Sequence, residues 1–283
     1  MKPIPKISII GSGIRVNLWK SFYKNLSENN DLDFEIIFTG HVTPNFELPK
    51  NFIFNYSETK PAQCVEISAR SASGDLVMIS SDDVIFNDHF LDNIYKHYIE
   101  NCSAKDAVSA SFQRRGYEYA TEDYQFWPGI DNSPMMPMNA VFKRTLWHDL
   151  GGIDINFIGL FYDLDLTLRL LENGGKTFFC KESKTEEIFP EDQDFLAQLR
   201  RKISTFLGKK EKPSSLYEEI GRGYDKPTLE RFWLKSLNDI KESDDYYAIN
   251  GDKAHMKKRL YAVESFTNES IVKYSQGPKG RWV

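Results

Sequence analysis

Short apolar runs, separated by segments of helical periodicity, organise the N-terminal third of the chain. Residues 7–10 (ISII) form the first run, and Gly11-Ser12-Gly13 follows it directly, which predicts a buried strand ending in a ligand-facing loop. Further runs at 34–38, 52–54 and 76–79 predict three more strands, and apolar positions at helical spacing predict helices over 18–26 and 65–72. This alternation predicts an α/β fold with a mostly parallel sheet, in which ligands bind at the carboxyl ends of the strands.

The middle of the chain predicts shorter elements around one long connection. That connection covers residues 116–138 and is rich in aromatic residues and proline, and loops of this length inside a compact domain are usually functional. The other predicted elements are helices over 90–98, 144–150 and 163–171 and strands over 107–112, 140–142 and 176–180. From about residue 189 the pattern becomes helical and highly charged. We therefore predict an α/β domain over 1–188 and a mainly helical extension over 189–283.

Composition and charge narrow the classes of function. The 283 residues are 41% hydrophobic and 27% charged with a net charge of −5, so we expect a folded protein without the basic surface that nucleic acid requires. Three scattered cysteines indicate neither a disulfide framework nor a cysteine-rich metal site. The chain starts without a signal-peptide pattern and contains no apolar stretch of about 18 residues. We expect a cytoplasmic protein with at most peripheral membrane association, and the oligomeric state stays open.

Two adjacent carboxylates, Asp82 and Asp83, follow the apolar run at 76–79. Carboxylates at the end of a buried strand can hold Mg²⁺ or Mn²⁺, because these cations prefer hard oxygen ligands. Such an ion offsets the charge that grows on a leaving diphosphate. The alternative is a solvated turn, in which Asp is common.

A second acidic cluster, Asp163-Leu164-Asp165, begins the predicted helix over 163–171. Helix capping and the helix dipole explain one of these carboxylates without any function. The other follows the apolar segment 157–161. A carboxylate near an apolar wall has a raised pKa and can act as a general base toward an acceptor hydroxyl.

Between residues 7 and 180 the chain resembles the family 2 glycosyltransferases and their GT-A relatives. The segment SASGDLVMISSDD resembles that family's turn, apolar strand and Asp-rich metal motif, and AVFKRTLWHDLGGID followed by FYDLDLTLRLLENGG resembles its Gly-Gly-Phe-Asp segment and its Glu-Asp-x-Asp-Leu helix. The resemblance implies a GT-A (Rossmann-like) fold over 1–188. It also implies a hexosyl- or related transferase of polysaccharide biosynthesis that uses a nucleotide diphosphate sugar as donor.

The same resemblance assigns roles to individual residues. Asp83 matches the carboxylate that ligates the metal, Asp82 the one that meets the ribose or the metal, and Asp163 the catalytic base. Gly11 and Ser12 match the loop that touches the nucleotide base. Gly152 and Asp154 match the segment that shapes the acceptor side.

Several positions depart from the family pattern. Ser80 stands where the metal motif often has its first Asp, and Tyr162 stands where an acidic residue usually precedes the base. Thr39-Gly40 replaces an Asp that reads the nucleotide base, and Val65 and Glu66 stand nearest to the expected Arg-Asn pair. The sequence indicates no His as a third metal ligand after Cys180.

Two further candidates lie outside the two acidic clusters. Arg281, in the sequence GPKGRW near the C-terminus, could close over the donor diphosphate, although chain ends are usually frayed. Trp127 and its aromatic neighbours could form a shelf for an acceptor sugar, and ordinary packing explains them equally well.

The prediction is a divalent-metal-dependent glycosyltransferase that acts on a glycan, lipid-linked or small-molecule acceptor with inversion at the sugar carbon. Three alternatives stay open. The first is a retaining relative of the same fold, and the second is a non-catalytic GT-A-like protein that binds a nucleotide sugar or a glycan. The third is a nucleotidyltransferase, for which the loop from Gly11 to Arg15 is a short version of the glycine-rich loop required.

Overall fold

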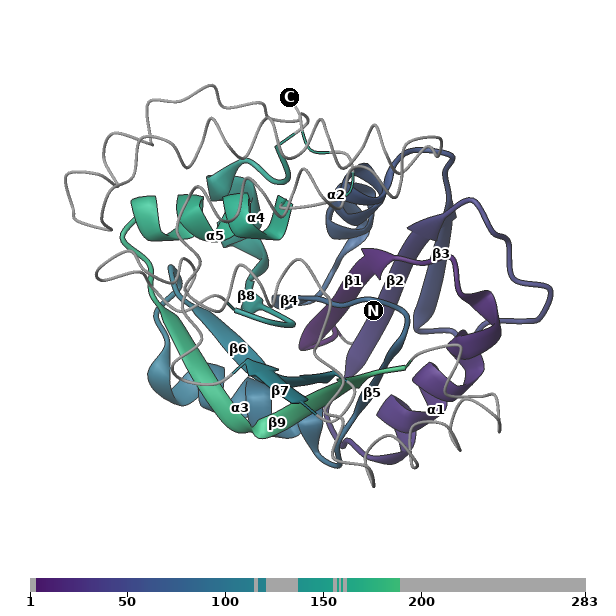
Figure 1. Ribbon diagram of the computed structural model, residues 1–283, viewed down its shortest axis with the longest axis horizontal. Helices are drawn as coiled ribbons and strands as arrows, with labels where there is room; N and C mark the ends of the chain where they lie inside the picture. The colour runs from purple at the N-terminus through teal and green to yellow at the C-terminus, as the bar shows by residue number, and fades with distance from the viewer. Residues whose placement is uncertain are drawn as a thin grey trace, which may run out of the picture.

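The apolar runs of the N-terminal third form four neighbouring parallel strands, as predicted (Figure 1). The strands are β1 (Ile7–Ser12), β2 (Phe34–Gly40), β3 (Phe52–Tyr56) and β4 (Leu76–Ile79), in the spatial order β3-β2-β1-β4. In register, Ile9 of β1 lies beside Ile36 of β2 and Met78 of β4. All seven residues of β2 are buried, as expected for a strand covered on both faces.

The described structure, a computed structural model, comprises residues 4–114, 117–120, 137–154, 157, 159 and 162–188. Within these residues nine strands form one mixed sheet, which continues past β4 in the order β8-β6-β9-β5, with β7 paired to β6. The strands of this second half are β5 (Val84–Phe86), β6 (Ala107–Arg114), β7 (Tyr117–Ala120), β8 (Val141–Lys143) and β9 (Thr177–Glu187). β6 and β9 pair in parallel, whereas β4 with β8, β6 with β8, β6 with β7 and β5 with β9 are antiparallel.

Three features of the second half differ from the sequence prediction. β5 is only three residues long, too short for a periodicity to be visible. β7 lies inside the segment 116–138, which was expected to be one connection. β9 continues past residue 180 to Glu187. The prediction stopped at residue 180 because exposed polar residues then alternate with the buried Ser183 and Thr185 and form no apolar run.

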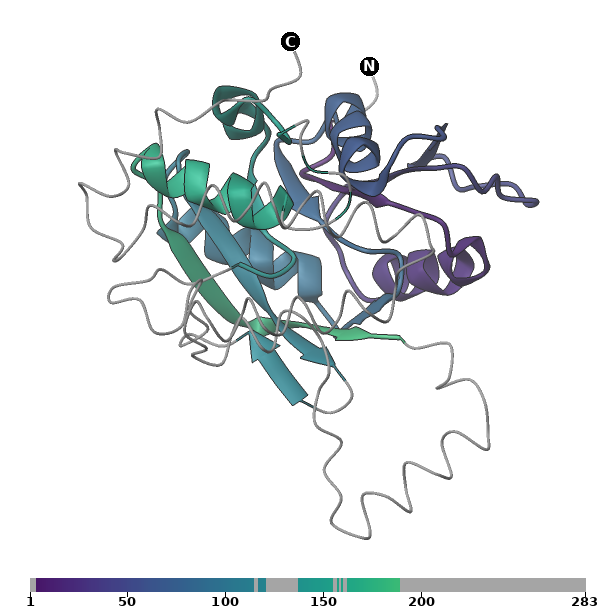
Figure 2. The same cartoon turned by 45° about the horizontal axis from the view of Figure 1, so that its top comes forward.

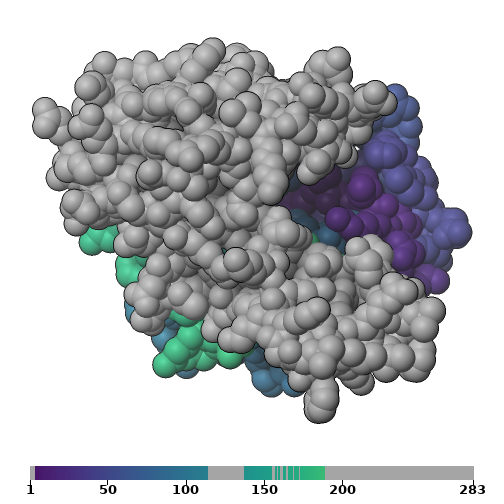
Figure 3. Space-filling view, viewed as in Figure 1, coloured from purple at the N-terminus to yellow at the C-terminus, as the bar shows by residue number. Residues whose placement is uncertain are grey.

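Helices cover both faces of the sheet (Figures 1 and 2). The elements are the 3-10 turn η1 (Val16–Leu18) and the helices α1 (Trp19–Glu28), α2 (Pro61–Ser71), α3 (Phe90–Asn101), α4 (Arg144–Leu150) and α5 (Tyr162–Glu172). Figure 1 shows α2, α4 and α5 on one side of the sheet and α1 and α3 on the other. The residues of β1 to β3 form one side of the molecule in the space-filling view (Figure 3).

Aromatic side chains fill the core on the α1 face. Trp19 is fully buried, and its ring centroid lies 5.3 to 5.6 Å from those of Phe38, Phe52 and Phe54. Phe22 continues the cluster to Phe86 of β5, with centroids 5.3 Å apart. Aromatic pairs at such separations stabilise a core by more than the burial of their surface area alone. They hold α1 against the sheet, next to the loop that follows β1.

Parts of the chain for which the sequence made predictions lie outside the described residues. They include the extension over 189–283, Arg281 and Trp127. Among the helices that the structure describes, each is too short or too polar to cross a membrane.

Candidate active site

The loop that follows β4 brings Asp82 and Asp83 to the carboxyl end of the parallel half of the sheet. The loop stays close to β1, because Ser80 N–H donates to Ile10 O over 2.9 Å. Gly11 allows this approach: a Cβ at that position would lie 2.2 Å from Ser80 O. The carbonyl of Gly11 also accepts a hydrogen bond from Ser68 Oγ at 2.9 Å. Packing thus accounts for Gly11, and its contact with a nucleotide base stays a prediction.

Ser12, the other residue expected to meet the base, is partly exposed at the end of β1. It lies beside the thiol of Cys64 on α2. Burial raises the pKa of Cys64, and hydrogen bonds from Thr59 and Ser12 oppose part of that rise. Of Gly11 and Ser12, only Ser12 is therefore partly exposed to a ligand.

Asp82 is fully buried, and its carboxylate organises the loop between β1 and α1. Oδ2 accepts hydrogen bonds from Ile14 N at 2.8 Å, Arg15 N at 2.6 Å and Trp19 Nε1 at 3.1 Å. Oδ1 accepts one from Arg15 Nη1 at 2.8 Å. A carboxylate offers about four lone-pair positions, so these four donors saturate it in this conformation. Asp82 does not fit as a metal ligand here.

Asp83 has a different environment. Its side chain is 7% exposed, and its Oδ2 lies 2.9 Å from Arg15 Nη2. Its backbone carbonyl accepts a hydrogen bond from Ile188 N at 2.6 Å, which joins it to the end of β9. The guanidinium of Arg15 therefore bridges Asp82 and Asp83, with 42% of its own side chain exposed.

Charge at this cluster is unbalanced. Burial alone would lower the pKa of Arg15, yet Asp83, Asp82 and Glu187 together raise it. Three carboxylates thus act on one guanidinium, which leaves the cluster negatively charged. Two like charges about 4 Å apart near a protein surface repel by roughly 1 to 4 kcal/mol, so an added cation would favour the binding of any anionic group here. The donor set of Asp83 and Glu187 fits a hard divalent cation that keeps most of its ligands as water and phosphate oxygen.

Glu187 was not predicted as part of the site. It lies at the end of β9 opposite Val84, the residue that follows Asp83. The polar and buried alternation over 181–187 is the signal that could have extended the strand to this position.

The acidic pair of α5 divides into a structural and an accessible member. Asp165 is 1% exposed and pairs with Arg169, whose Nε and Nη2 lie 2.9 and 2.8 Å from Oδ2. The Nη2 contact has ion-pair distance without hydrogen-bond geometry. Arg169 Nη1 donates to the carbonyls of Leu150 and Gly152, each at 2.6 Å. Asp165 therefore fixes α5 to the end of α4, and Asp163 is the partly exposed carboxylate of the two.

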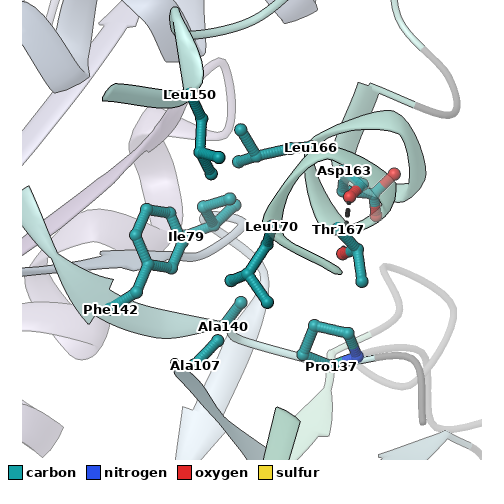
Figure 4. A pocket seen from close by; sticks show the side chains of 10 residues that line it. All are labelled: Ile79, Ala107, Pro137, Ala140, Phe142, Leu150, Asp163, Leu166, Thr167 and Leu170. Atoms are coloured by element: carbon teal, nitrogen blue, oxygen red, sulfur yellow. Dashed lines mark hydrogen bonds between the residues drawn. The ribbon is translucent and has the colours of Figure 1, made fainter. Parts of the chain in front are cut away.

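Asp163 lines a small, mostly apolar cavity under α5 (Figure 4). Its walls include Ile79, the last residue of β4, together with Phe142 and Leu166. The cavity measures about 20 Å³, which is room for roughly one water molecule. It cannot hold a sugar, but it places the first turn of α5 beside the end of the strand that carries Asp82 and Asp83. Burial raises the pKa of the neighbouring Tyr162, and the charge of Asp163 adds to that rise.

Glu66 explains one departure from the family pattern. Its buried carboxylate accepts hydrogen bonds from Trp147 Nε1 at 3.0 Å and Ile153 N at 2.9 Å. A Cβ on Gly152, whose φ is +69°, would lie 2.5 Å from Glu66 Oε2. Glu66 and Gly152 thus shape the turn after α4 by packing. Asp154 is 4% exposed just beyond that turn, and its role toward an acceptor stays a prediction.

A sheet with a parallel half, a mixed half and an acidic loop at their junction defines a mixed α/β fold of the GT-A-like glycosyltransferase type. Three structures of the staphylococcal glycosyltransferase TarS share it. S. aureus TarS 1-349 in complex with UDP aligns with a TM-score of 0.51 at 13% identity, covering 91% of this chain and 78% of that one. The same TarS segment in a second structure gives 0.53 at 14% identity, covering 95% and 88%. A further structure of S. aureus TarS gives 0.52 at 12% identity, covering 92% of this chain and 55% of that one.

At these identities the similarity shows the fold alone. No protein-family model matches the sequence, and no curated protein matches it.

Proposed function

We propose that the chain is a glycosyltransferase that transfers a sugar from a nucleotide diphosphate sugar to an acceptor. One observation carries the proposal: Asp163, in the first turn of α5, lines the same cavity as Ile79, the last residue of the strand that leads into Asp82 and Asp83. The UDP bound by TarS supports a nucleotide as the donor's leaving group.

Asp83 is the proposed metal ligand, with Glu187 as the nearest further carboxylate that acts on Arg15. A bound Mg²⁺ or Mn²⁺ would supply charge stabilisation to the leaving diphosphate. Asp82 takes a positioning role instead, since its hydrogen bonds to Ile14, Arg15 and Trp19 hold the loop after β1.

Arg15 is the proposed contact to the donor diphosphate. Its Nη2 contacts Asp83 and its Nη1 contacts Asp82, so a cation held by Asp83 would free Nη2 while Nη1 would stay on Asp82. The exposed part of the guanidinium then faces the leaving phosphates, where charge-assisted hydrogen bonds are strong. Arg281 would add a second cation if the C-terminal tail closes over the donor.

Asp163 is the proposed general base. It is the partly exposed carboxylate at the start of α5, and a group that takes a proton from an acceptor hydroxyl has to be accessible to that hydroxyl. The proposed outcome is inversion at the sugar carbon, to be read by proton NMR of the product. The acceptor class is a glycan, a lipid-linked sugar or a small molecule.

Thermal shift with a panel of nucleotide diphosphates and their sugars, with Mn²⁺ or with EDTA, tests the proposal first. We expect one nucleotide diphosphate to raise the melting temperature with Mn²⁺ and much less with EDTA. Asp83→Asn should then reduce donor turnover by roughly 10²- to 10³-fold, the scale of losing one charge-stabilising group. Asp92→Asn, at a partly exposed position in the first turn of α3, is the control and should leave turnover unchanged.

The alternative is a non-catalytic domain that binds a nucleotide sugar or glycan. It predicts the same thermal shift without manganese-dependent turnover for any donor and acceptor pair. Absence of any shift across the whole panel would refute both readings.

A further inference from the structure

A second group of metal-ligating side chains lies where α3 packs on β9, apart from the acidic loop. It consists of His97 on α3 and Cys180 and Glu182 on β9. One ligand atom of each lies within 4.8 Å of the other two. Within the described residues this is the one such group of three His, Cys, Asp or Glu side chains. Neither Asp83 nor Asp163 belongs to it, so the proposed glycosyltransferase site does not use it.

A break in the strand creates this arrangement. Ala110 of β6 pairs with Cys180, but the next residue, Ser111, pairs with Lys184. Residues 181–183 therefore leave the ladder as a bulge. Ser183 is fully buried within it and donates its hydroxyl to Phe90 O at 2.9 Å, which ties the bulge to the start of α3. Bulges re-aim side chains at functional positions, and this one turns Cys180 and Glu182 toward His97.

Two of the three side chains, Cys180 and Glu182, already interact. Cys180 Sγ donates to Ser183 Oγ at 3.5 Å and lies 3.8 Å from Glu182 Oε2. Tetrahedral binding would bring the three ligand atoms to roughly 3 to 4 Å from one another, given metal–ligand bonds of about 2.0 to 2.3 Å. Glu182 is exposed and His97 is partly exposed, so rotation of these two side chains closes the gap without movement of the strand.

We infer that His97, Cys180 and Glu182 bind a borderline-soft divalent cation of the zinc class. Thiolate, imidazole and carboxylate together suit zinc, whereas Mg²⁺ and Mn²⁺ prefer oxygen alone. Three protein ligands leave a fourth position for water. The bound ion joins α3 to the bulge of β9 and stabilises the fold there, because it binds the folded arrangement and not the unfolded chain.

Deprotonation of Cys180 accompanies this binding. Burial raises the pKa of the Cys180 thiol, so the side chain carries its proton at neutral pH. A coordinating thiol loses that proton to solvent. Binding therefore releases a proton and strengthens as the pH rises.

Cobalt titration of the full-length, EDTA-treated protein tests the site directly. Co²⁺ bound to a thiolate gives a near-ultraviolet sulfur-to-cobalt absorption, and the chain has only three cysteines. We expect the band at one equivalent of Co²⁺, its loss in Cys180→Ser and its retention in Cys64→Ser and Cys102→Ser. A band that persists in Cys180→Ser, or no band in the wild type, overturns the proposal.

Zinc calorimetry gives an independent readout. His97→Ala should weaken zinc binding by at least about tenfold, on the scale of losing one ligand or its support. The matched control His148→Ala, on the exposed end of α4, should leave binding unchanged, as should Glu100→Gln. Equal affinities of His97→Ala and His148→Ala refute the site. Because His97 is partly exposed, this variant should fold normally, and equal melting temperatures in EDTA check that. Nucleotide binding is measured separately, so a failure here is distinct from a failure of the glycosyltransferase proposal.

Discussion

Asp82 holds Arg15 at both ends: the backbone N–H of Arg15 donates to Oδ2 at 2.6 Å, and its guanidinium donates to Oδ1 at 2.8 Å. The same carboxylate accepts from Ile14 N and Trp19 Nε1. The acidic motif predicted that Asp82 binds a metal or the ribose. In this structure its carboxylate instead accepts hydrogen bonds from other residues of the protein. The proposal therefore assigns metal binding to Asp83, whose contact with Arg15 is a single one at a half-exposed guanidinium.

Asp82→Asn should destabilise the protein far more than Asp83→Asn. An amide at position 82 either turns its NH₂ toward donors or leaves buried N–H groups unpaired, which costs about 3 kcal/mol of unfolding free energy. Asp83→Asn removes an ion pair to a partly exposed partner, worth about 1 kcal/mol or less. Urea denaturation of both variants measures the difference. Equal losses would mean that Asp82 does not hold the loop.

Arg15→Gln should change metal and nucleotide binding in opposite directions. Without nucleotide, Mn²⁺ should bind about fivefold tighter, because the Arg15 guanidinium no longer competes with the metal for Asp83. Its interaction with Asp83 is worth at least roughly 1 kcal/mol. A nucleotide diphosphate at saturating Mn²⁺ should bind about tenfold weaker, since a charge-assisted hydrogen bond is lost.

Calorimetry with Mn²⁺ alone and then with UDP measures both effects. Lys96→Gln, on the exposed face of α3, is the control and should change neither. If both affinities fall in Arg15→Gln, Arg15 supports the loop and does not exchange partners.

Asp106→Asn should lose stability at neutral pH and recover it relative to wild type in acid. Burial alone would raise the pKa of Asp106, but hydrogen bonds from Ser103 and Lys176 lower it overall. Ser103 N and Lys176 N donate to its two oxygens at 2.7 and 2.8 Å. A lowered folded-state pKa stabilises the protein above the unfolded value of about 3.9 and ceases to do so as the pH falls through the folded value.

Denaturation of wild type and Asp106→Asn from pH 7 downward measures this. The gap between them should be largest at neutral pH and should narrow below about pH 4. Asp75→Asn, which changes an exposed carboxylate paired with Lys143, is the control and should show a small gap at every pH. A gap for Asp106→Asn that is independent of pH would contradict the assignment.

Local patterns predicted the parallel half of the sheet because its strands are continuous apolar runs. The chain from 76 to 79 matches β4 residue for residue. Long-range pairs were beyond such patterns. Nothing near Asp82 in sequence indicates that its donors lie 67 and 68 residues away, and Glu66 meets Ile153 across 87 residues. Side chains that close such distances decide which carboxylates are structural, so the hydrogen bonds of Asp82 and Glu66 were not visible in the sequence, and the roles of Asp83 and Asp163 stay predictions.

Asp163→Asn should abolish transfer and leave donor binding intact. Loss of a general base typically costs about 10²- to 10⁴-fold in turnover. The neighbouring Asp165 is buried and paired with Arg169, and this pair stabilises the packing of α5. Asp165→Asn is therefore the matched comparison: it should lower the melting temperature more than Asp163→Asn does. Transfer rates with saturating donor, together with UDP affinity by calorimetry, separate the two effects. Because Asp163 lies beside the end of β4 without belonging to the Arg15 cluster, its variant should bind Mn²⁺ as the wild type does. Retention of transfer in Asp163→Asn would remove it as the base.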